Sequence, residues 1–442
     1  MNTKAASERK RLSQIVFGPW IRSIRALVLK KLSALRGGSV RLSDSAGMQM
    51  LGAGGPPIEV RVNDQRFYRR VAYGGSLGAA ESYIAGEWQC DDLIGLMRLF
   101  VRNRHAASRL DRGWCWLMQM GARIGHWRRS NTRGGSRRNI GAHYDLGNDF
   151  FQHWLDDTLA YSSGIFPEWN ASLREASVEK FDRVCRKLDL RPGDRVLEIG
   201  TGWGGFALHA ARHYGCHVTT TTISREQHKL ACQRIKAAGV SDRITVLNCD
   251  YRDLTGQFDK LVSIEMIEAV GPQFLDAFFR KCGELLKPTG SMVLQGIVMP
   301  ERDYDNYLAS VDFIRKYVFP GGSLPSVAAL LESAGRASRL RCVQLEDFAP
   351  HYAETLRRWR ANFEARLAEI RTLGYTERLI RLWRYYLCYC EAGFEERQVS
   401  VVQLVFDNAA CRRDALLLTR SASAALDRKA SAGISQPHYG TA

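Results

Sequence analysis

The sequence predicts an α/β protein with a doubly wound, mostly parallel sheet, preceded in the chain by a smaller α+β domain. Three observations support this fold class. From Asp194 onward, short apolar runs alternate with helical patterns. A Gly-x-Gly turn follows the first of these runs, where open α/β sheets bind their ligands. Ahead of them, residues 41–110 alternate short apolar runs with Gly-Gly turns and end in a helical pattern.

The expected strands and helices follow one another at short intervals. We expect strands at residues 196–199, 217–222, 244–247, 261–264 and 291–297. Helices are expected to begin at Gly204, Arg225 and Gln273, and a turn at 287–290 precedes the last of these strands. The crossovers between parallel strands should be right-handed. Beyond Gly322 the chain becomes helical and rich in aromatic residues, up to a final apolar run at 399–406.

Basic residues gather in two segments ahead of the α/β region. The chain has 442 residues and a net charge of +17. Residues 1–40 hold nine basic groups against one acid, and residues 112–144 hold seven arginines and no acid. Such segments suit a polyanionic surface, either nucleic acid or an anionic bilayer. We expect five segments. They are a basic amphipathic leader (1–40), a small α+β domain (41–115), an Arg/Gly-rich linker (116–140), a main α/β domain (141–410) and a flexible tail (411–442).

Residues 15–35 predict a basic amphipathic helix. Their large apolar side chains recur at helical spacing, and Arg22, Arg25 and Lys30 lie off that stripe. Such a helix either lies in the headgroup layer of an anionic membrane or packs its stripe on the protein's own core, and the sequence leaves both alternatives open. Because arginines interrupt the apolar run and no small-residue cleavage site follows it, we expect neither export nor a membrane span.

The eleven cysteines form no C-x-x-C pair. An odd number of cysteines in a long chain indicates free thiols in a reducing compartment. We therefore expect no disulfides, no structural zinc or other metal site, and a cytoplasmic protein.

The glycine-rich turn after the first expected strand predicts a cofactor that carries a nucleoside. Gly200, Gly202 and Gly205 have the spacing of a dinucleotide motif, but the next strand ends in threonines rather than in an acid. Glu198 beside these glycines instead suits a positively charged ligand such as S-adenosylmethionine. The ribose contacts then fall to Thr222 and Gln227.

Together with other segments, these motifs resemble the cyclopropane-fatty-acyl-phospholipid synthase family of S-adenosylmethionine-dependent methyltransferases, which includes the mycolic acid cyclopropane synthases. The resemblance spans about residues 140–410 and is carried by residues 143–151, 161–163, 196–205, 222–227, 250–253, 265–268, 319–322 and 385–390. It implies that the main domain is catalytic, with a Rossmann-like class I methyltransferase fold and helical insertions that form an acyl pocket.

The resemblance also assigns site residues. Its cofactor-contacting positions fall on Tyr161, Ser162, Val196, Leu197, Glu198, Ile199, Gly200, Thr201, Gly202, Trp203, Gly204, Thr222, Ile223, Ser224, Arg225, Glu226, Gln227, Tyr251 and Arg252. Cys390 matches the active-site cysteine. In the synthases a bound bicarbonate takes the proton, and its shell falls here on Ser163, Glu268, Gln295, Ile297 and Tyr352. Ser163 stands where cysteine is usual and Gln295 where histidine is usual, although both side chains can hydrogen-bond an anion.

The expected chemistry fits these residue types. An alkene is a weak nucleophile, so the enzyme gains most by holding it against the sulfonium methyl in a dry pocket. Aromatic faces stabilise the carbocation that follows methyl transfer, and we expect them among Tyr304, Tyr307, Phe313, Tyr317, Trp383 and Tyr386. A base must then remove a proton so that the ring closes. The expected base is Glu268, directly or through a bound anion, with Cys390 and Tyr352 as the other catalytic candidates.

We therefore expect transfer of a methylene group from S-adenosylmethionine to a cis double bond of an unsaturated acyl chain, most naturally in a membrane phospholipid, to give a cyclopropane ring. The basic leader and linker would dock peripherally on an anionic membrane surface, and the resemblance suggests a homodimer. The alternatives are a methyl-branching or small-molecule methyltransferase on the same fold, or a catalytically silent lipid-binding homologue. Nucleic acid is not expected as a substrate, because residues 265–268 read Glu-Met-Ile-Glu instead of an Asn/Asp-Pro-Pro-aromatic clamp.

Overall fold

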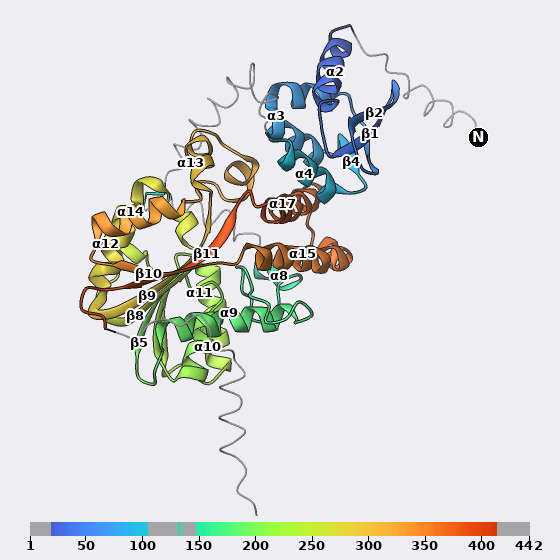
Figure 1. Ribbon diagram of the computed structural model, residues 1–442. Helices are drawn as coiled ribbons and strands as arrows, with labels where there is room; N and C mark the ends of the chain where they lie inside the picture. Colours follow the sequence, from blue (N-terminus) through green and yellow to red (C-terminus); the bar gives the residue numbers. More distant parts are fainter. Residues whose placement is uncertain (1–18, 105–130, 133–134, 136–146, 413–442) are drawn as a thin grey trace, which may run out of the picture.

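The computed structural model describes residues 19–104, 131, 132, 135 and 147–412. A small N-terminal unit and a larger α/β unit lie on either side of helix α17 (Glu377–Glu395) (Figure 1). The leader up to residue 18, most of the 116–140 linker, residues 143–146 and the tail beyond 412 lie outside the described residues.

The larger unit is built on a seven-stranded sheet with the order β10-β11-β9-β8-β5-β6-β7. In chain order the strands are β5 (Arg195–Ile199), β6 (His217–Thr221), β7 (Ile244–Leu247), β8 (Phe258–Ile264), β9 (Leu286–Val298), β10 (Arg341–Asp347) and β11 (Ser400–Asp407). Only β11 runs against its neighbours β9 and β10, and the remaining pairs are parallel. The predicted fold class, a mostly parallel α/β sheet, is confirmed.

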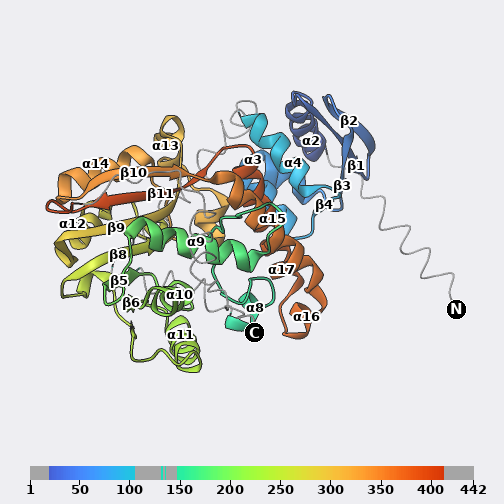
Figure 2. The ribbon, with the colours of Figure 1, turned by 60° about the horizontal axis from the view of Figure 1, so that its bottom comes forward.

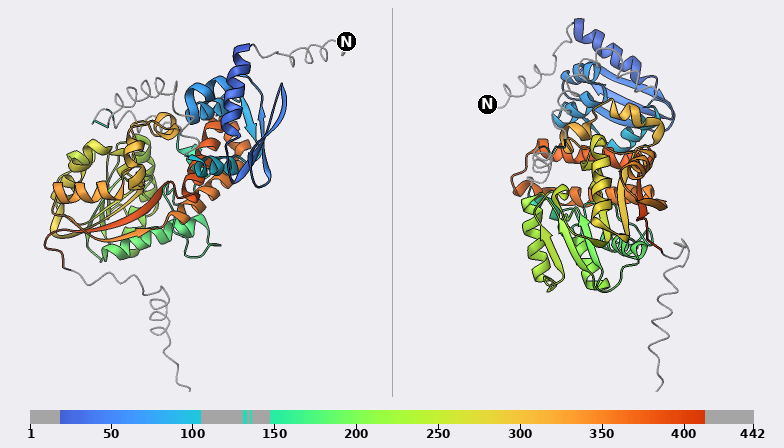
Figure 3. Two further views of the ribbon diagram at one scale, coloured as in Figure 1. Left: turned by 45° about the horizontal axis from the view of Figure 1, so that its top comes forward. Right: turned by 90° about the vertical axis from the view of Figure 1, so that its left-hand side faces the viewer.

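Helices cover both faces of this sheet (Figures 2 and 3). One face packs against α9 (Leu173–Leu188), α10 (Gly205–Tyr214) and α11 (Arg225–Ala237), and the other packs against α12 (Leu275–Leu285) and α14 (Val327–Ala337). Strand β5 shows why both layers form. Val196 packs in the core on the α9, α10 and α11 face, whereas Leu197 and Ile199 pack in the core on the α12 and α14 face. Successive side chains of a strand point to opposite faces of the sheet.

Two local expectations differ from the structure. Strand β10 was not expected, because it lies at the edge of the sheet and mixes polar and apolar side chains, none of which is fully buried. The turn expected at 287–290 lies inside β9. There the pairing with β8 jumps from Leu286 opposite Phe258 to Ser291 opposite Lys260, so the four residues form an irregularity within the strand.

The N-terminal unit has a four-stranded sheet with the order β2-β1-β3-β4. Its strands are β1 (Gly38–Asp44), β2 (Gly47–Ala53), β3 (Pro57–Val62) and β4 (Trp88–Cys90), with α3 (Arg66–Ile84) and α4 (Leu93–Arg102). Helix α2 (Pro19–Leu32) packs on α3 and β2 and buries Ile24, Val28 and Leu29. Of the two alternatives for this helix, its apolar stripe therefore packs on the protein's own core, while Trp20 and Leu27 stay exposed.

The N-terminal unit also braces the walls of the larger unit. Helix α17 packs against α3, α4 and α15 (Ala349–Ala365). Arg381 of α17 donates hydrogen bonds to the backbone carbonyls of Tyr83 and Trp88. Glu81 of α3 accepts hydrogen bonds from Lys316 and Tyr317 of the π-helix Ile314–Val318, each at 2.7 Å. The small domain thus fixes two segments that line the cavity described next.

Candidate active site

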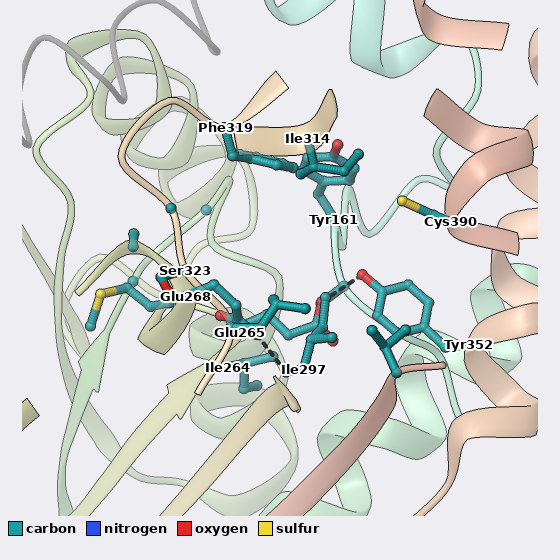
Figure 4. Close-up of a pocket in the computed structure, with 18 of the residues that line it drawn as sticks. Tyr161, Ile264, Glu265, Glu268, Ile297, Ile314, Phe319, Ser323, Tyr352 and Cys390 are labelled. Carbon is teal, nitrogen blue, oxygen red and sulfur yellow. Dashed lines mark hydrogen bonds between the residues drawn. The ribbon is translucent and has the colours of Figure 1, made fainter. Parts of the chain in front are cut away.

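A cavity of about 570 Å³ opens at the carboxyl edge of the main sheet. The ends of β5, β6 and β8 line one half, and α15, α17 and the segment around the π-helix line the other (Figure 4). The first half contains the glycine-rich turn, as expected for an open α/β sheet. The second half is mainly apolar and aromatic. The site therefore combines a crevice for a polar cofactor with a pocket for a hydrocarbon.

The glycine-rich turn brings its backbone close to the cofactor crevice. Gly200 and Gly202 have φ angles of 106° and 52°, which glycine adopts at little cost. A Cβ on Gly200 would also lie 3.3 Å from the Cβ of Met266. A hydrogen bond of 2.7 Å between the hydroxyls of Thr201 and Thr220 connects the turn to strand β6.

Glu198 and Lys180 are two buried titratable side chains beside this crevice. Burial raises the pKa of Glu198 to about 8, although its carboxyl accepts a hydrogen bond of 2.6 Å from the Thr220 hydroxyl. Burial also lowers the pKa of Lys180 to about 8. The Lys180 ammonium donates to the hydroxyl of Ser162 at 2.6 Å. A bound cation would favour the charged form of Glu198, so the crevice suits a positively charged ligand.

The structure brings together most of the expected cofactor positions. Those that line the cavity are Tyr161, Ser162, Glu198, Ile199, Gly200, Thr201, Gly202, Trp203, Thr222, Ile223, Gln227 and Tyr251. The Thr222 hydroxyl donates to the side-chain oxygen of Gln227 at 2.8 Å, so the two expected ribose contacts lie side by side.

The other seven cofactor positions do not line the cavity: Val196, Leu197, Gly204, Ser224, Arg225, Glu226 and Arg252. Val196 and Leu197 lie in the two cores of the sheet. Ser224 caps helix α11 by accepting a hydrogen bond from the Gln227 amide. Arg252 forms an ion pair with Asp250 at 2.7 Å. Arg225 and Glu226 are exposed on α11.

The acyl half of the cavity is walled by aromatic and aliphatic side chains. Tyr161 and Tyr386 share a hydrogen bond of 2.8 Å between their hydroxyls, and Ile314 and Phe319 lie near Tyr161 (Figure 4). Of the six expected wall aromatics, Tyr307 and Tyr386 line the cavity. The other four, Tyr304, Phe313, Tyr317 and Trp383, do not.

Cys390 lines the acyl half as expected, on helix α17 (Figure 4). Burial raises the pKa of its thiol, so it is neutral near pH 7. It contributes to the wall of the pocket as a small apolar group.

A carboxylate that the sequence analysis did not assign, Glu265, lies at the junction of the two halves. It accepts hydrogen bonds from the Ser163 amide at 2.9 Å and the Gln295 side-chain amide at 2.8 Å. It also accepts one from the Tyr352 hydroxyl at 2.7 Å (Figure 4). Its φ of 50° is unusual for a residue other than glycine. The segment 265–268 is one of those that carry the resemblance, but its pattern did not show which glutamate receives these donors.

The neighbouring Glu268 is held differently. One carboxyl oxygen accepts a hydrogen bond of 2.5 Å from the Ile297 amide, and the other is buried without a partner within the described residues. Burial, and then the charge of Glu265, raise the pKa of Glu268 to about 8. Burial also raises the pKa of Glu265, but Tyr352, Gln295 and Lys180 oppose this. Glu265 therefore takes the negative charge first, and Glu268 keeps its proton near pH 7.

The hydrogen bonds to Glu265 and Glu268 use the donors that the expected bicarbonate shell would need. Four of its five expected positions supply a donor, and every one of these donors is directed at a glutamate: Ser163, Gln295 and Tyr352 at Glu265, and Ile297 at Glu268. The Ser163 hydroxyl donates instead to the Gly164 carbonyl. The residues present do not fit a further anion, because it would lie against the carboxylate of Glu265.

Comparison with known proteins assigns the chain to a family. Residues 131–404, more than half of the chain, match the family model of mycolic acid cyclopropane synthetase. The chain belongs to this family. It is 38% identical over 343 residues to tuberculostearic acid methyltransferase UfaA1 of Mycobacterium tuberculosis, covering 76% of this chain and 79% of that protein. It is 37% identical over 356 residues to cyclopropane-fatty-acyl-phospholipid synthase of Escherichia coli, covering 80% and 88%.

Solved structures agree with this assignment. The cyclopropane synthase MmaA2 from Mycobacterium tuberculosis superimposes with a TM-score of 0.58 at 26% identity, over 62% of this chain and 98% of that one. Mycolic acid cyclopropane synthase CmaA1, complexed with SAH and CTAB, gives a TM-score of 0.58 at 30% identity, over the same shares. The predicted family and class of enzyme are confirmed: this family member is an S-adenosylmethionine-dependent methyltransferase.

Glu198→Gln tests the electrostatics of the crevice. At pH 7 the Glu198 carboxyl of this methyltransferase is mostly protonated, because its pKa is about 8. A cationic ligand lowers that pKa, so binding of S-adenosylmethionine should release protons. We expect Glu198→Gln to release fewer protons and to weaken binding roughly tenfold, or about 1.4 kcal/mol. Calorimetry in buffers of different ionisation enthalpy measures both quantities.

Glu226→Gln is the matched control, because Glu226 is exposed and does not line the cavity. It should bind and release protons like the wild type. Equal proton release by all three proteins would contradict a role for Glu198.

Proposed function

We propose that this methyltransferase transfers a methylene group from S-adenosylmethionine to a cis double bond of an unsaturated acyl lipid, giving a cyclopropane ring. One observation carries the proposal. The Glu265 carboxyl, which accepts three hydrogen bonds, lies between the cofactor crevice and an apolar pocket. A base in that place is what the final step of cyclopropane formation needs.

The charges of the cavity match the charges of the reaction. S-adenosylmethionine supplies an electrophilic methyl group on a sulfonium and leaves as a neutral thioether. Glu265 and Glu198 present acidic groups to this side of the cavity, balanced by the buried Lys180. The rings of Tyr161 and Tyr386 wall the acyl side. Carboxylates and aromatic faces both stabilise positive charge as it moves from the sulfur to the acyl chain.

The residues then act in two steps. In the first, the cavity walls hold the alkene against the methyl group, and the alkene electron pair forms the new C–C bond as the S–C bond breaks. This leaves a carbocation on the neighbouring chain carbon. In the second, Glu265 takes a proton from the transferred methyl, and the released C–H electron pair closes the ring onto the cation. Glu265 carries the proton away, and Glu268 stays protonated throughout.

The substrate class follows from the cavity and from the relatives. The acyl half is lined mainly by aliphatic and aromatic side chains, with Asp312 and Arg315 paired at 3.9 Å, which suits a hydrocarbon chain. The two relatives compared above are named for action on fatty acyl groups or tuberculostearic acid. An unsaturated acyl chain, most naturally in a phospholipid, fits both observations.

We further propose peripheral docking on an anionic membrane from the cytoplasmic side. No helix in the described part of the chain is long and apolar enough to cross a membrane. The outer face of α2 exposes Trp20 and Leu27 beside Arg22 and Lys30. Apolar side chains flanked by basic ones suit the headgroup layer of anionic lipid.

Turnover with labelled S-adenosylmethionine and an unsaturated phospholipid tests the proposed reaction. We expect the released fatty acid to gain the mass of CH₂ by mass spectrometry, and to show cyclopropane protons and no olefinic protons by NMR. A product that keeps a double bond, as a methylene branch does, would contradict ring closure. Binding without any product would favour the catalytically silent alternative.

A pair of substitutions distinguishes the two glutamates. Glu268→Gln imitates the protonated acid and should leave kcat within about tenfold of the wild type. Glu265→Gln removes the base and should lower kcat by roughly 10²-fold or more. The reverse order would show that Glu268 is the base. Partial rescue of Glu265→Ala by added formate would support a proton-accepting role at this position.

Vesicle sedimentation tests the docking surface. At low salt we expect stronger binding to anionic than to zwitterionic vesicles, and weaker binding for Trp20→Ala. Trp169→Ala is the matched control, because Trp169 is equally exposed at 61% against 56% for Trp20. Equal binding to both vesicle types would exclude electrostatic docking.

A further inference from the structure

A row of buried polar side chains runs from the Glu265 carboxylate to the far edge of the sheet. Gln295 on β9 lies opposite Gln403 on β11, and Gln403 lies opposite Glu346 on β10. Gln295 and Gln403 are fully buried. Strands β10, β11, β9 and β8 lie side by side in that order (Figure 1). The row therefore crosses three adjacent strands and ends at Glu265, which follows the last residue of β8.

Hydrogen bonds link the members of the row, with Lys187 joining Gln403 to Glu346. Gln295 donates its amide N–H to Glu265 at 2.8 Å, and Gln403 donates to the side-chain oxygen of Gln295 at 2.9 Å. The Lys187 ammonium on α9 donates to the side-chain oxygen of Gln403 at 2.7 Å. Lys187 also donates to Glu346 at 2.6 Å, and Arg183 donates to the same carboxylate.

The ammonium fixes the direction of these bonds. A glutamine amide can accept at one end and donate at the other, so either orientation alone would satisfy a glutamine pair. Lys187 has donors only. Gln403 must therefore turn its oxygen to Lys187 and its N–H groups to Gln295, and Gln295 must turn its N–H groups to Glu265. An N–H favours the ionised carboxylate, whereas a carbonyl in that place would favour the protonated acid.

We propose that Lys187 and Gln403 are positioning residues that orient Gln295 and thereby keep Glu265 ionised to accept the proton. This inference rests on the proposed function, in which Glu265 is the base. It adds two residues that do not line the cavity and that no part of the reaction touches. A network that only stabilised the sheet would not depend on the direction of its hydrogen bonds.

Four other charged or titratable side chains lie around Glu265, on the elements that pack against it. They are Lys180 on α9, Glu268 after β8, Tyr352 on α15, and Tyr386 on α17. The substitutions below leave all four in place, so a change in the ionisation of Glu265 reports on the row.

Gln403→Glu reverses the direction with almost no change in volume. The new carboxylate accepts from Lys187 and from the Gln295 N–H groups, so Gln295 turns its oxygen to Glu265. We expect the midpoint of the acidic limb of the single-turnover pH–rate profile to rise by about one pH unit. At a pH below both midpoints the rate should therefore fall about tenfold, and at high pH it should recover to the wild-type value. Gln403→Met removes the orientation without adding charge and should shift the midpoint in the same direction by less.

Gln344→Glu is the matched control, because it adds a carboxylate to β10 outside the row. Its midpoint should stay with the wild type. A uniform loss of rate at every pH in Gln403→Glu, or an equal shift in Gln344→Glu, would overturn the proposal.

A second readout does not depend on turnover. Infrared titration follows the carboxyl band that disappears in Glu265→Gln, and its midpoint should rise in Gln403→Glu. If no cyclopropane forms but this band shifts as expected, the proposed function fails while the positioning role stands. If cyclopropane forms and the band does not shift, the positioning role fails alone.

Discussion

The buried carboxylate of Glu265 is the constraint on which the site depends. An ionised group removed from water is costly unless donors surround it. Here Ser163, Gln295 and Tyr352 each supply one hydrogen bond, from a loop, a strand and a helix that are distant in the sequence. All three donors must be in place at the same time. The loop after α8 (Asn148–Gln152), the sheet and helix α15 must therefore keep fixed positions relative to one another.

The remaining parts of the molecule serve this arrangement. The glycine-rich turn lets a cofactor approach one side of Glu265, and Tyr161, Tyr386 and Phe319 wall the other. The N-terminal unit contributes indirectly. It holds α17 through Arg381 and holds the π-helix through Glu81. A largely apolar wall limits the number of water molecules near the reacting atoms, which strengthens the electrostatic interactions there and protects a carbocation from hydrolysis.

Most of the fold, but only part of the site, could be predicted from the sequence. The alternating pattern and the glycine turn are local signals, and both placed the parallel sheet and the crevice correctly. Strand β10 carries no such signal, because it is an edge strand whose apolar residues Val343 and Leu345 are exposed. Glu265 was missed because its importance comes from three donors that only the fold brings together. For the same reason the sequence did not show that Val196 and Leu197 face the cores. The proposed homodimer stays a prediction.

A crystal structure with a bound S-adenosylmethionine analogue such as sinefungin tests the central claim most directly. The account predicts that the analogue occupies the Gly200 crevice with its amine-bearing transfer position facing Glu265, and that Ser163, Gln295 and Tyr352 still donate to that carboxylate. A bicarbonate ion seated on those three donors, with Glu265 turned away from the cavity, would contradict it.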